Sequence, residues 1–250
     1  MTHPNVLLLC NLAFVDICYP TTILHKLIDS LLSGNDLVTF IQCFTQMYFF
    51  AVLALIEVIV LSSMAYDHYV AICKPLRYHL FMNKRVCVLM IVGTWILGFL
   101  NASVFTNLAS KTPFCWTNKI NQFFCDITAV AGISCDVTKI YMENVSFGLI
   151  PFSLNLISYI NIIHSILQIK PSHGRKTSFS TCTSHLTVLM LFYGAVVWMY
   201  MSPSSKSDNL EPMLSMLYTV VTPMLNPLIY SPRNNVVKTA VKRIMKRIIS

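Results

Sequence analysis

Six long apolar segments constrain this chain more than any other feature of its sequence. An α-helix needs about 20 mainly apolar residues to cross roughly 30 Å of hydrocarbon. Segments of that kind lie near residues 5–27, 41–73, 86–106, 141–169, 178–201 and 210–231. A backbone in lipid must satisfy its own hydrogen bonds, and helices do so within one segment. The sequence therefore predicts an all-α membrane protein with six transmembrane helices.

Composition supports the same class. Only 11% of the 250 residues are charged and 55% are hydrophobic, whereas a soluble domain carries about 25% charged residues. The first residues, Met1 to Pro4, have neither a basic region nor a small-residue cleavage site. We therefore expect no removable signal peptide. The prediction is one transmembrane domain over residues 1–250, with the first apolar segment as an uncleaved anchor.

The basic residues indicate how the chain is oriented. Most of the 18 Lys and Arg residues lie in the loops after the second and fourth spans and in the tail. They are Lys74, Arg77, Lys84, Arg85, Lys170, Arg175, Lys176, Arg233, Lys238, Lys242, Arg243, Lys246 and Arg247. With six spans these regions share one face, which the positive-inside rule makes cytosolic. The net charge of +8 thus indicates membrane lipid as a partner and not nucleic acid.

The tail over residues 235–249 has apolar residues at helical spacing and basic residues between them. The apolar positions are Val236, Val237, Ala240, Val241, Ile244, Met245 and Ile248. Such a pattern predicts a helix that lies in the cytosolic membrane interface and does not form a seventh span.

Two carboxylates lie inside apolar spans. Asp16 is roughly 18 Å from the cytosolic start of its helix, and Glu57 is roughly 15 Å from the cytosolic end of the next one, at 1.5 Å rise per residue. A charge in mid-membrane costs at least about 2.5 kcal/mol, so each acid should face the bundle. We interpret the pair as a site for a sodium ion or a proton. The alternative is two protonated acids, each hydrogen-bonded to helix neighbours.

Four of the nine cysteines lie on the predicted outer face. Cys115, Cys125 and Cys135 fall in one polar stretch, and Cys43 opens the second span. Thiols outside the cytosol meet an oxidising compartment, and four cysteines allow three pairings. The other five are interpreted as small apolar fillers. They are Cys10, Cys18, Cys73, Cys87 and Cys182.

Four motifs, in order along the chain, resemble those of vertebrate odorant receptors, a family of G-protein-coupled receptors. They are Asn11–Tyr19 (NLAFVDICY), Met64–Tyr78 (MAYDHYVAICKPLRY), Ser180–Leu186 (STCTSHL) and Pro223–Tyr230 (PMLNPLIY). The resemblance covers essentially the whole chain and places these motifs at the family's helices two, three, six and seven. It implies a receptor helix bundle with six of the seven family helices and the interfacial helix.

The resemblance also implies roles for particular residues. It pairs Cys43 with Cys125 and Cys115 with Cys135, and it makes Asp16 and Glu57 the buried ion-site acids. Residues of the G-protein face and of activation are Asp67, His68, Tyr69, Tyr159, Asn226, Pro227 and Tyr230. Candidate ligand-binding residues, counted from the motifs, are Phe50, Ala51, Ala54, Leu55, Phe147, Tyr193, Val197, Tyr200, Met216 and Thr219. Their mainly apolar character, with a few hydroxyls, suits small volatile molecules, although helix packing is the alternative for each.

The chain departs from the family pattern in ways that bear on function. It shows neither the family's outer N-terminal segment nor its first helix, and His68 stands where the family has Arg. A guanidinium is always charged and has five donors, whereas imidazole is shorter and mostly neutral at pH 7. Pro232, in place of the family's leucine, is interpreted as opening the interfacial helix. We therefore expect weaker coupling to the olfactory G protein.

The prediction is an odorant receptor in the cell membrane that responds to small apolar ligands. A second hypothesis is a truncated product that inserts, is retained in the endoplasmic reticulum and does not signal. A transporter or channel that uses Asp16 and Glu57 is a third, but the sequence shows no internal repeat of the kind transporters carry. An enzyme is not predicted, because the sequence has neither a Gly-rich phosphate loop nor an H-E-x-x-H motif.

Overall fold

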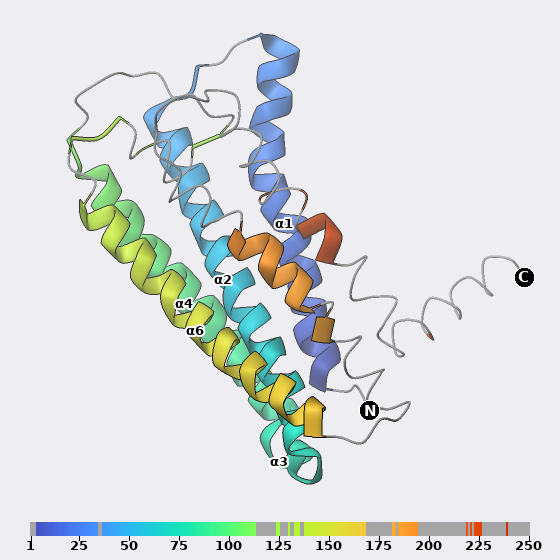
Figure 1. Ribbon diagram of the computed structural model, residues 1–250. Helices are drawn as coiled ribbons and strands as arrows, with labels where there is room; N and C mark the ends of the chain where they lie inside the picture. Colours follow the sequence, from blue (N-terminus) through green and yellow to red (C-terminus); the bar gives the residue numbers. More distant parts are fainter. Residues whose placement is uncertain are drawn as a thin grey trace, which may run out of the picture.

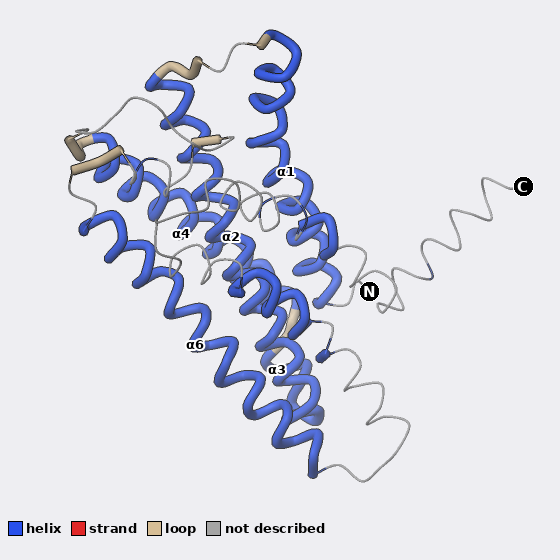
Figure 2. Tube along the Cα trace, turned by 45° about the horizontal axis from the view of Figure 1, so that its top comes forward, coloured by secondary structure: helices blue, strands red, loops and turns tan. Residues whose placement is uncertain are grey.

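The computed structural model describes residues 4–34, 37–113, 124–125, 130, 133–135, 138–168, 182–183, 185–194, 219, 221, 223–226 and 239. For residues 4–5, 27, 30 and 138–147 it describes the backbone alone. The elements are α1 (Pro4–Ser33), α2 (Phe40–Cys73), η1 (Pro75–Arg77), α3 (Tyr78–Phe81), α4 (Lys84–Ser110) and α6 (Thr138–Gln168). A shorter apolar helix covers His185–Gly194. Figures 1 and 2 show the long helices as one bundle.

Four helices in the described part of the chain are long and apolar enough to cross a membrane, namely α1, α2, α4 and the Gly148–Gln168 part of α6. The all-α membrane fold is thereby confirmed. The fifth predicted span is described mainly over residues 185–194, and the sixth only at residues 219, 221 and 223–226. Apart from Thr239, the predicted interfacial helix lies outside the described residues.

The bundle is organised around α2, which packs against α1, α4 and α6. Its first turn is closed by a capping box, in which Thr39 Oγ1 accepts from the Gln42 N–H and Gln42 Oε1 accepts from the Thr39 N–H. The side chain of Asn83 similarly caps α4 by accepting from the Val86 N–H at 3.0 Å. Such caps satisfy backbone donors that a helix start leaves unpaired.

Gly98 allows α4 to lie close against the middle of α2. A Cβ atom added at Gly98 would lie 2.8 Å from Ile56 Cγ1 and 3.3 Å from the carbonyl oxygen of Val52. Gly34, just after α1, has a φ of 64°, a left-handed conformation that glycine adopts at little cost. These two glycines shape the bundle in different ways, one by close approach and one by ending a helix.

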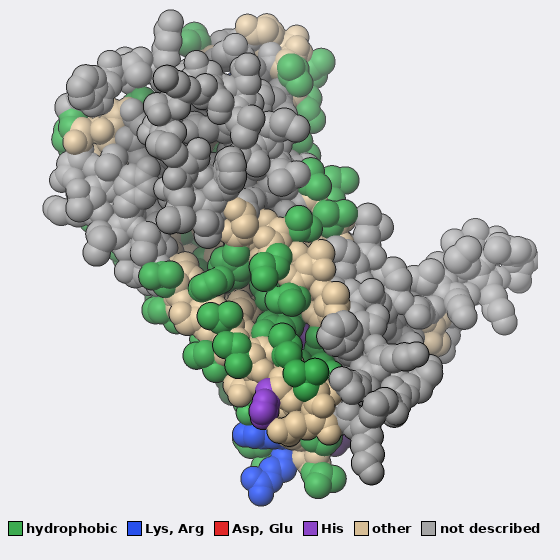
Figure 3. Space-filling model, viewed as in Figure 1, with side chains coloured by type: hydrophobic (Ala, Val, Ile, Leu, Met, Phe, Trp, Pro, Cys, Tyr) green, Lys and Arg blue, Asp and Glu red, His purple; other side chains and the backbone are tan. Residues whose placement is uncertain are grey.

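The outer surfaces of the helices suit lipid. On α4, large apolar side chains face outward along the helix. They include Val88, Leu89, Val92, Ile96, Leu97, Leu100 and Val104. In Figure 3 hydrophobic side chains cover much of the described surface, whereas the visible Lys and Arg side chains gather at the tip beside α3. This arrangement agrees with the cytosolic orientation that the basic residues predict.

Candidate functional site

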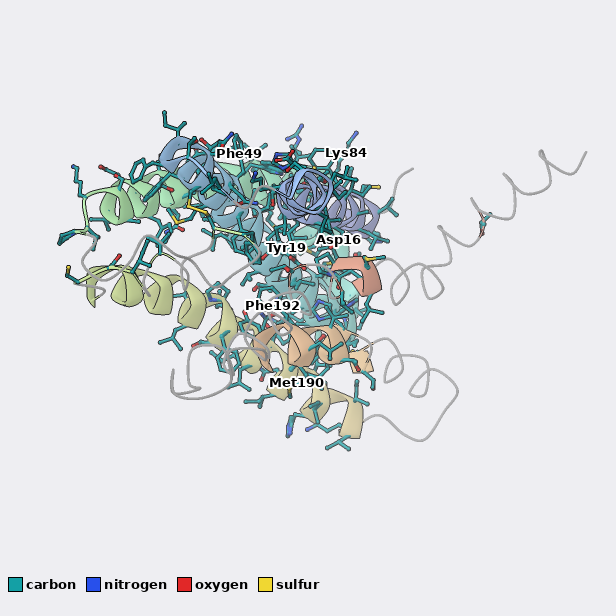
Figure 4. All side chains as sticks on the ribbon, turned by 90° about the horizontal axis from the view of Figure 1, so that it is seen from above. Asp16, Tyr19, Phe49, Lys84, Met190 and Phe192 are labelled. Carbon is teal, nitrogen blue, oxygen red and sulfur yellow. A yellow bond between two sulfur atoms is a disulfide. The ribbon has the colours of Figure 1, made fainter. Side chains whose placement is uncertain are left out.

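The two intramembrane acids meet at a single amide group. Asn226 Nδ2 donates to Asp16 Oδ1 at 2.7 Å and to Glu57 Oε1 at 3.1 Å. Asp16 comes from α1, Glu57 from α2 and Asn226 from the segment 223–226, and all three side chains are buried. Seen from above, Asp16 points into the bundle near Tyr19 (Figure 4). The fold thus brings together three polar groups that are far apart in the sequence.

The acid site has unused acceptors. Glu57 Oε2 and Asn226 Oδ1 are both buried and have no hydrogen-bond partner among the residues the structure describes. Buried acceptors without donors are costly, and two of them beside two carboxyl groups fit a proton or a small cation. Sequence reasoning placed Asn226 at the activation face and missed this bridging contact, since nothing local in its motif indicates contact with Asp16.

A second polar cluster lies at the cytosolic end of α2. The hydroxyl of Tyr78 donates to Asp67 Oδ1 at 2.8 Å, and burial together with the Asp67 charge raises the pKa of Tyr78. The His68 ring meets the His185 ring edge to face at 5.5 Å between centroids. His185 is fully buried, and its Nδ1 shares a hydrogen bond with the hydroxyl of Tyr159.

This cluster joins α2, α6 and the helix 185–194. Tyr159 comes from α6 and stacks on His185 at 5.7 Å between ring centroids. The Sγ atom of Cys73, the last residue of α2, lies 3.0 Å from Ser165 Oγ of α6. The Lys74 ammonium group lies over the ring of Tyr69, 5.7 Å from its centroid. Tyr78 and His185 stand in the recognised motifs but were not predicted as functional residues.

One of the two implied disulfides is confirmed. Cys43 and Cys125 are bonded, with 5.2 Å between their Cα atoms, within the range that a disulfide requires. Cys135 is also disulfide-bonded, and its N–H donates to the Pro113 carbonyl. Cys115, its implied partner, lies outside the described residues, so that pairing stays a prediction. The five cysteines interpreted as fillers are free thiols.

The candidate ligand-binding residues separate into groups with different surroundings. Phe50 is buried and stacks on Tyr19 at 4.9 Å between ring centroids, with Phe124 at 5.3 Å. This is core packing, the alternative weighed for each candidate. Ala51, Ala54 and Leu55 are half-buried on α2, and Thr219 is fully buried.

Tyr193 belongs to a polar group that sequence reasoning did not find. Asn155 Nδ2 of α6 donates to Ser62 Oγ of α2 at 2.9 Å and to the hydroxyl of Tyr193 at 3.4 Å. Phe152 packs edge to face on the Tyr193 ring. The remaining candidates have side chains outside the described part of the chain, so their roles stay predictions. They are Phe147, Val197, Tyr200 and Met216, and the predicted activation residues Pro227 and Tyr230 lie outside the described part as well.

Comparison with known families and proteins identifies what this arrangement is similar to. Residues 1–247 match the family described as olfactory receptor. Olfactory receptor 13C9 of Homo sapiens is 44% identical over 98% of this chain and 80% of its own length. Olfactory receptor 5B21 of Mus musculus is 42% identical over 98% of this chain and 78% of its own length.

Proposed function

This chain belongs to the olfactory receptor family, and on that premise we propose that it binds a small odorant within its helix bundle and responds through a heterotrimeric G protein. Family membership makes it a multi-pass membrane receptor rather than an enzyme. Nothing in its relatives favours the transporter or channel hypothesis.

The contact between α2, α6 and the helix 185–194 is the observation that carries the ligand proposal. Apolar surroundings with few polar groups are typical of sites for small molecules. Ala51 and Ala54 are short and only half-buried on α2, while Tyr193 and Asn155 supply polar atoms from the facing helices. We assign ligand contact to this region and packing to Phe50.

The proposed G-protein face is the cytosolic cluster of Asp67, His68 and Tyr69. Histidine at position 68 offers fewer donors than arginine and no permanent charge. In the structure the His68 ring lies against His185, and Asp67 is engaged by Tyr78. Coupling is therefore proposed to be weak in this chain.

A sodium ion or a proton is proposed at Asp16 and Glu57. The support is the unpartnered Glu57 Oε2 and Asn226 Oδ1 atoms beside two buried carboxyl groups. Asn226 donates to both acids through one amide nitrogen, so an added cation or proton would meet acceptors on two sides. Thermal unfolding in sodium and in choline buffers separates the two occupants: stabilisation by sodium alone indicates the ion, and equal stability in both buffers indicates the proton.

The odorant proposal is tested by ligand-dependent thermal stability of the purified full chain together with a cyclic AMP reporter in cells. At least one odorant of a broad panel should raise the unfolding temperature. The same odorant should give a small cyclic AMP response, measured per receptor at the surface. A panel without any stabilising odorant would contradict the proposal.

A further inference from the structure

Three polar side chains meet inside the apolar bundle, at a level of α2 between Glu57 of the acid site and Asp67 of the cytosolic cluster. Ser62 of α2, Asn155 of α6 and Tyr193 of the helix 185–194 form this group, called here the Asn155 cluster. Asn155 is only 4% exposed. Polar groups are buried at a cost unless hydrogen bonds compensate, so each atom of the cluster should have a partner.

The orientation of the Asn155 amide follows from Ser62. The Ser62 hydroxyl donates to the Val58 carbonyl at 2.9 Å, so its oxygen must accept from Asn155. The amide nitrogen therefore faces Ser62 and Tyr193, and both of its hydrogens are used. The carbonyl oxygen, Asn155 Oδ1, is left buried without a partner in the described part of the chain.

The Asn155 cluster therefore presents one unused acceptor, Asn155 Oδ1, and one unused donor, the hydroxyl hydrogen of Tyr193. The Tyr193 oxygen accepts from Asn155, which leaves its own hydrogen to donate. A hydroxyl group is the small group that can do both things at once, donating to Asn155 Oδ1 and accepting from Tyr193. An aldehyde has only an acceptor, and an alkane has neither.

We propose that Asn155 and Tyr193 form a subsite for the hydroxyl group of an alcohol or phenol odorant, with the apolar part of the ligand against the surrounding helices. The inference rests on the proposed function and names the ligand class for that site. Phe152 and Phe192 both pack on the Tyr193 ring, which gives the hydroxyl subsite an apolar border. A site built to bond a hydroxyl rejects analogues without one, because its polar atoms are then unpaired.

The test uses matched sets of alcohol, aldehyde and alkane on linear, branched and aromatic skeletons. The readout is the ligand-induced rise in unfolding temperature of the purified full chain, which needs no coupling to a G protein. In at least one set the alcohol should stabilise more than its aldehyde and alkane. Asn155→Leu should raise the half-maximal alcohol concentration about tenfold, as loss of one hydrogen bond predicts, and leave the alkane unchanged.

Asn161→Leu is the matched control, since Asn161 is exposed on the same helix and its side-chain amide donates to the Ile157 carbonyl one turn earlier. Tyr193→Phe keeps the ring and removes the donor, so it should also weaken the alcohol preference even if Asn155→Leu folds poorly. Equal stabilisation by all three members of every set would overturn the hydroxyl subsite and leave the proposed function standing. An alcohol preference that survives both variants would do the same. A panel in which no compound stabilises the chain would overturn the proposed function and this inference together.

Discussion

The two ends of α2 are held in different ways. At its outer end Cys43 is bonded covalently to Cys125, and Gln46 accepts from the Cys125 N–H while its amide donates to the Thr22 carbonyl of α1. At its cytosolic end the links of α2 to α6 and the helix 185–194 are non-covalent: Cys73 Sγ contacts the Ser165 hydroxyl and the Asn161 carbonyl of α6, and the His68 ring contacts His185.

This difference indicates where the bundle can move. The disulfide and the hydrogen bonds of the Gln46 side chain keep the outer end in one arrangement. The non-covalent contacts of the cytosolic end can exchange at modest cost. Ligand bound near the middle of α2 would then shift the cytosolic end, where the G-protein face is proposed. Changes along α2 should therefore have effects that fall from its outer to its cytosolic end.

The largest effect is expected at the outer disulfide. Cys125→Ser should destabilise the chain by about 2–5 kcal/mol, because the bond joins residues separated by 82 positions. Thermal unfolding of the purified chain measures the change. Cys10→Ser is the control, since Cys10 is an exposed free thiol. Equal unfolding temperatures for the two variants would show that the outer end is not held by this bond.

The second effect concerns the middle of α2. Gly98→Val should cost about 1–3 kcal/mol by overpacking, because its Cβ would lie 2.8 Å from Ile56 Cγ1 and near the rigid Val52 carbonyl. Gly93→Val on the same helix is the control, as a Cβ there meets no heavy atom within 4 Å. Equal destabilisation by Gly98→Val and Gly93→Val would show that the close approach of α4 at Gly98 does not hold the middle of α2.

Sequence predicted the long helices well because apolar runs end where charge begins. The second span was predicted at residues 41–73, and α2 covers Phe40–Cys73, since Lys74 and Pro75 stop it. The first span was predicted to end at residue 27, but α1 continues to Ser33. Beyond the predicted end, Lys26 and Asp29 pair with each other at 2.8 Å, so the helix continues through them.

Contacts between distant segments were harder to predict. The depth of Asp16 and Glu57 followed from helical rise, but the Asn226 bridge depends on how a segment 210 residues further along packs. Residue spacing left three cysteine pairings open, and only the family resemblance indicated Cys43 with Cys125. Asn155 carried no signal in the sequence, because a single amide in an apolar run does not show which helices face it.

The third effect concerns the hydrogen bond from Tyr78 to Asp67. Tyr78→Phe should destabilise the chain by about 1 kcal/mol, the usual contribution of one hydrogen bond. The pKa of Tyr78 is raised in the folded chain, so its contribution is fully present below the unfolded value of about 10 and is lost as pH rises through the folded value. The difference between variant and parent should thus stay constant from about pH 6 to 9. A difference that disappears within this range would contradict the assigned bond.

The smallest effect on stability, but a large one on signalling, is expected at His68. His68→Arg should change stability by less than about 0.5 kcal/mol, because the position is near the surface end of α2 and half-buried. Arginine adds a permanent charge beside Asp67 and donors that imidazole lacks. Odorant-dependent cyclic AMP, normalised to surface receptor, should rise on the order of tenfold, within the usual range of coupling energies.

His79→Arg is the matched control, since His79 is exposed on α3 and the same charge is added close by. A general gain in positive charge would raise the cyclic AMP signal in both variants, whereas a gain specific to the G-protein face appears only at position 68. If ligand raises the unfolding temperature of His68→Arg as it does for the parent, the change lies in coupling and not in odorant binding. An unchanged signal with unchanged binding would contradict the proposal that histidine at position 68 weakens coupling.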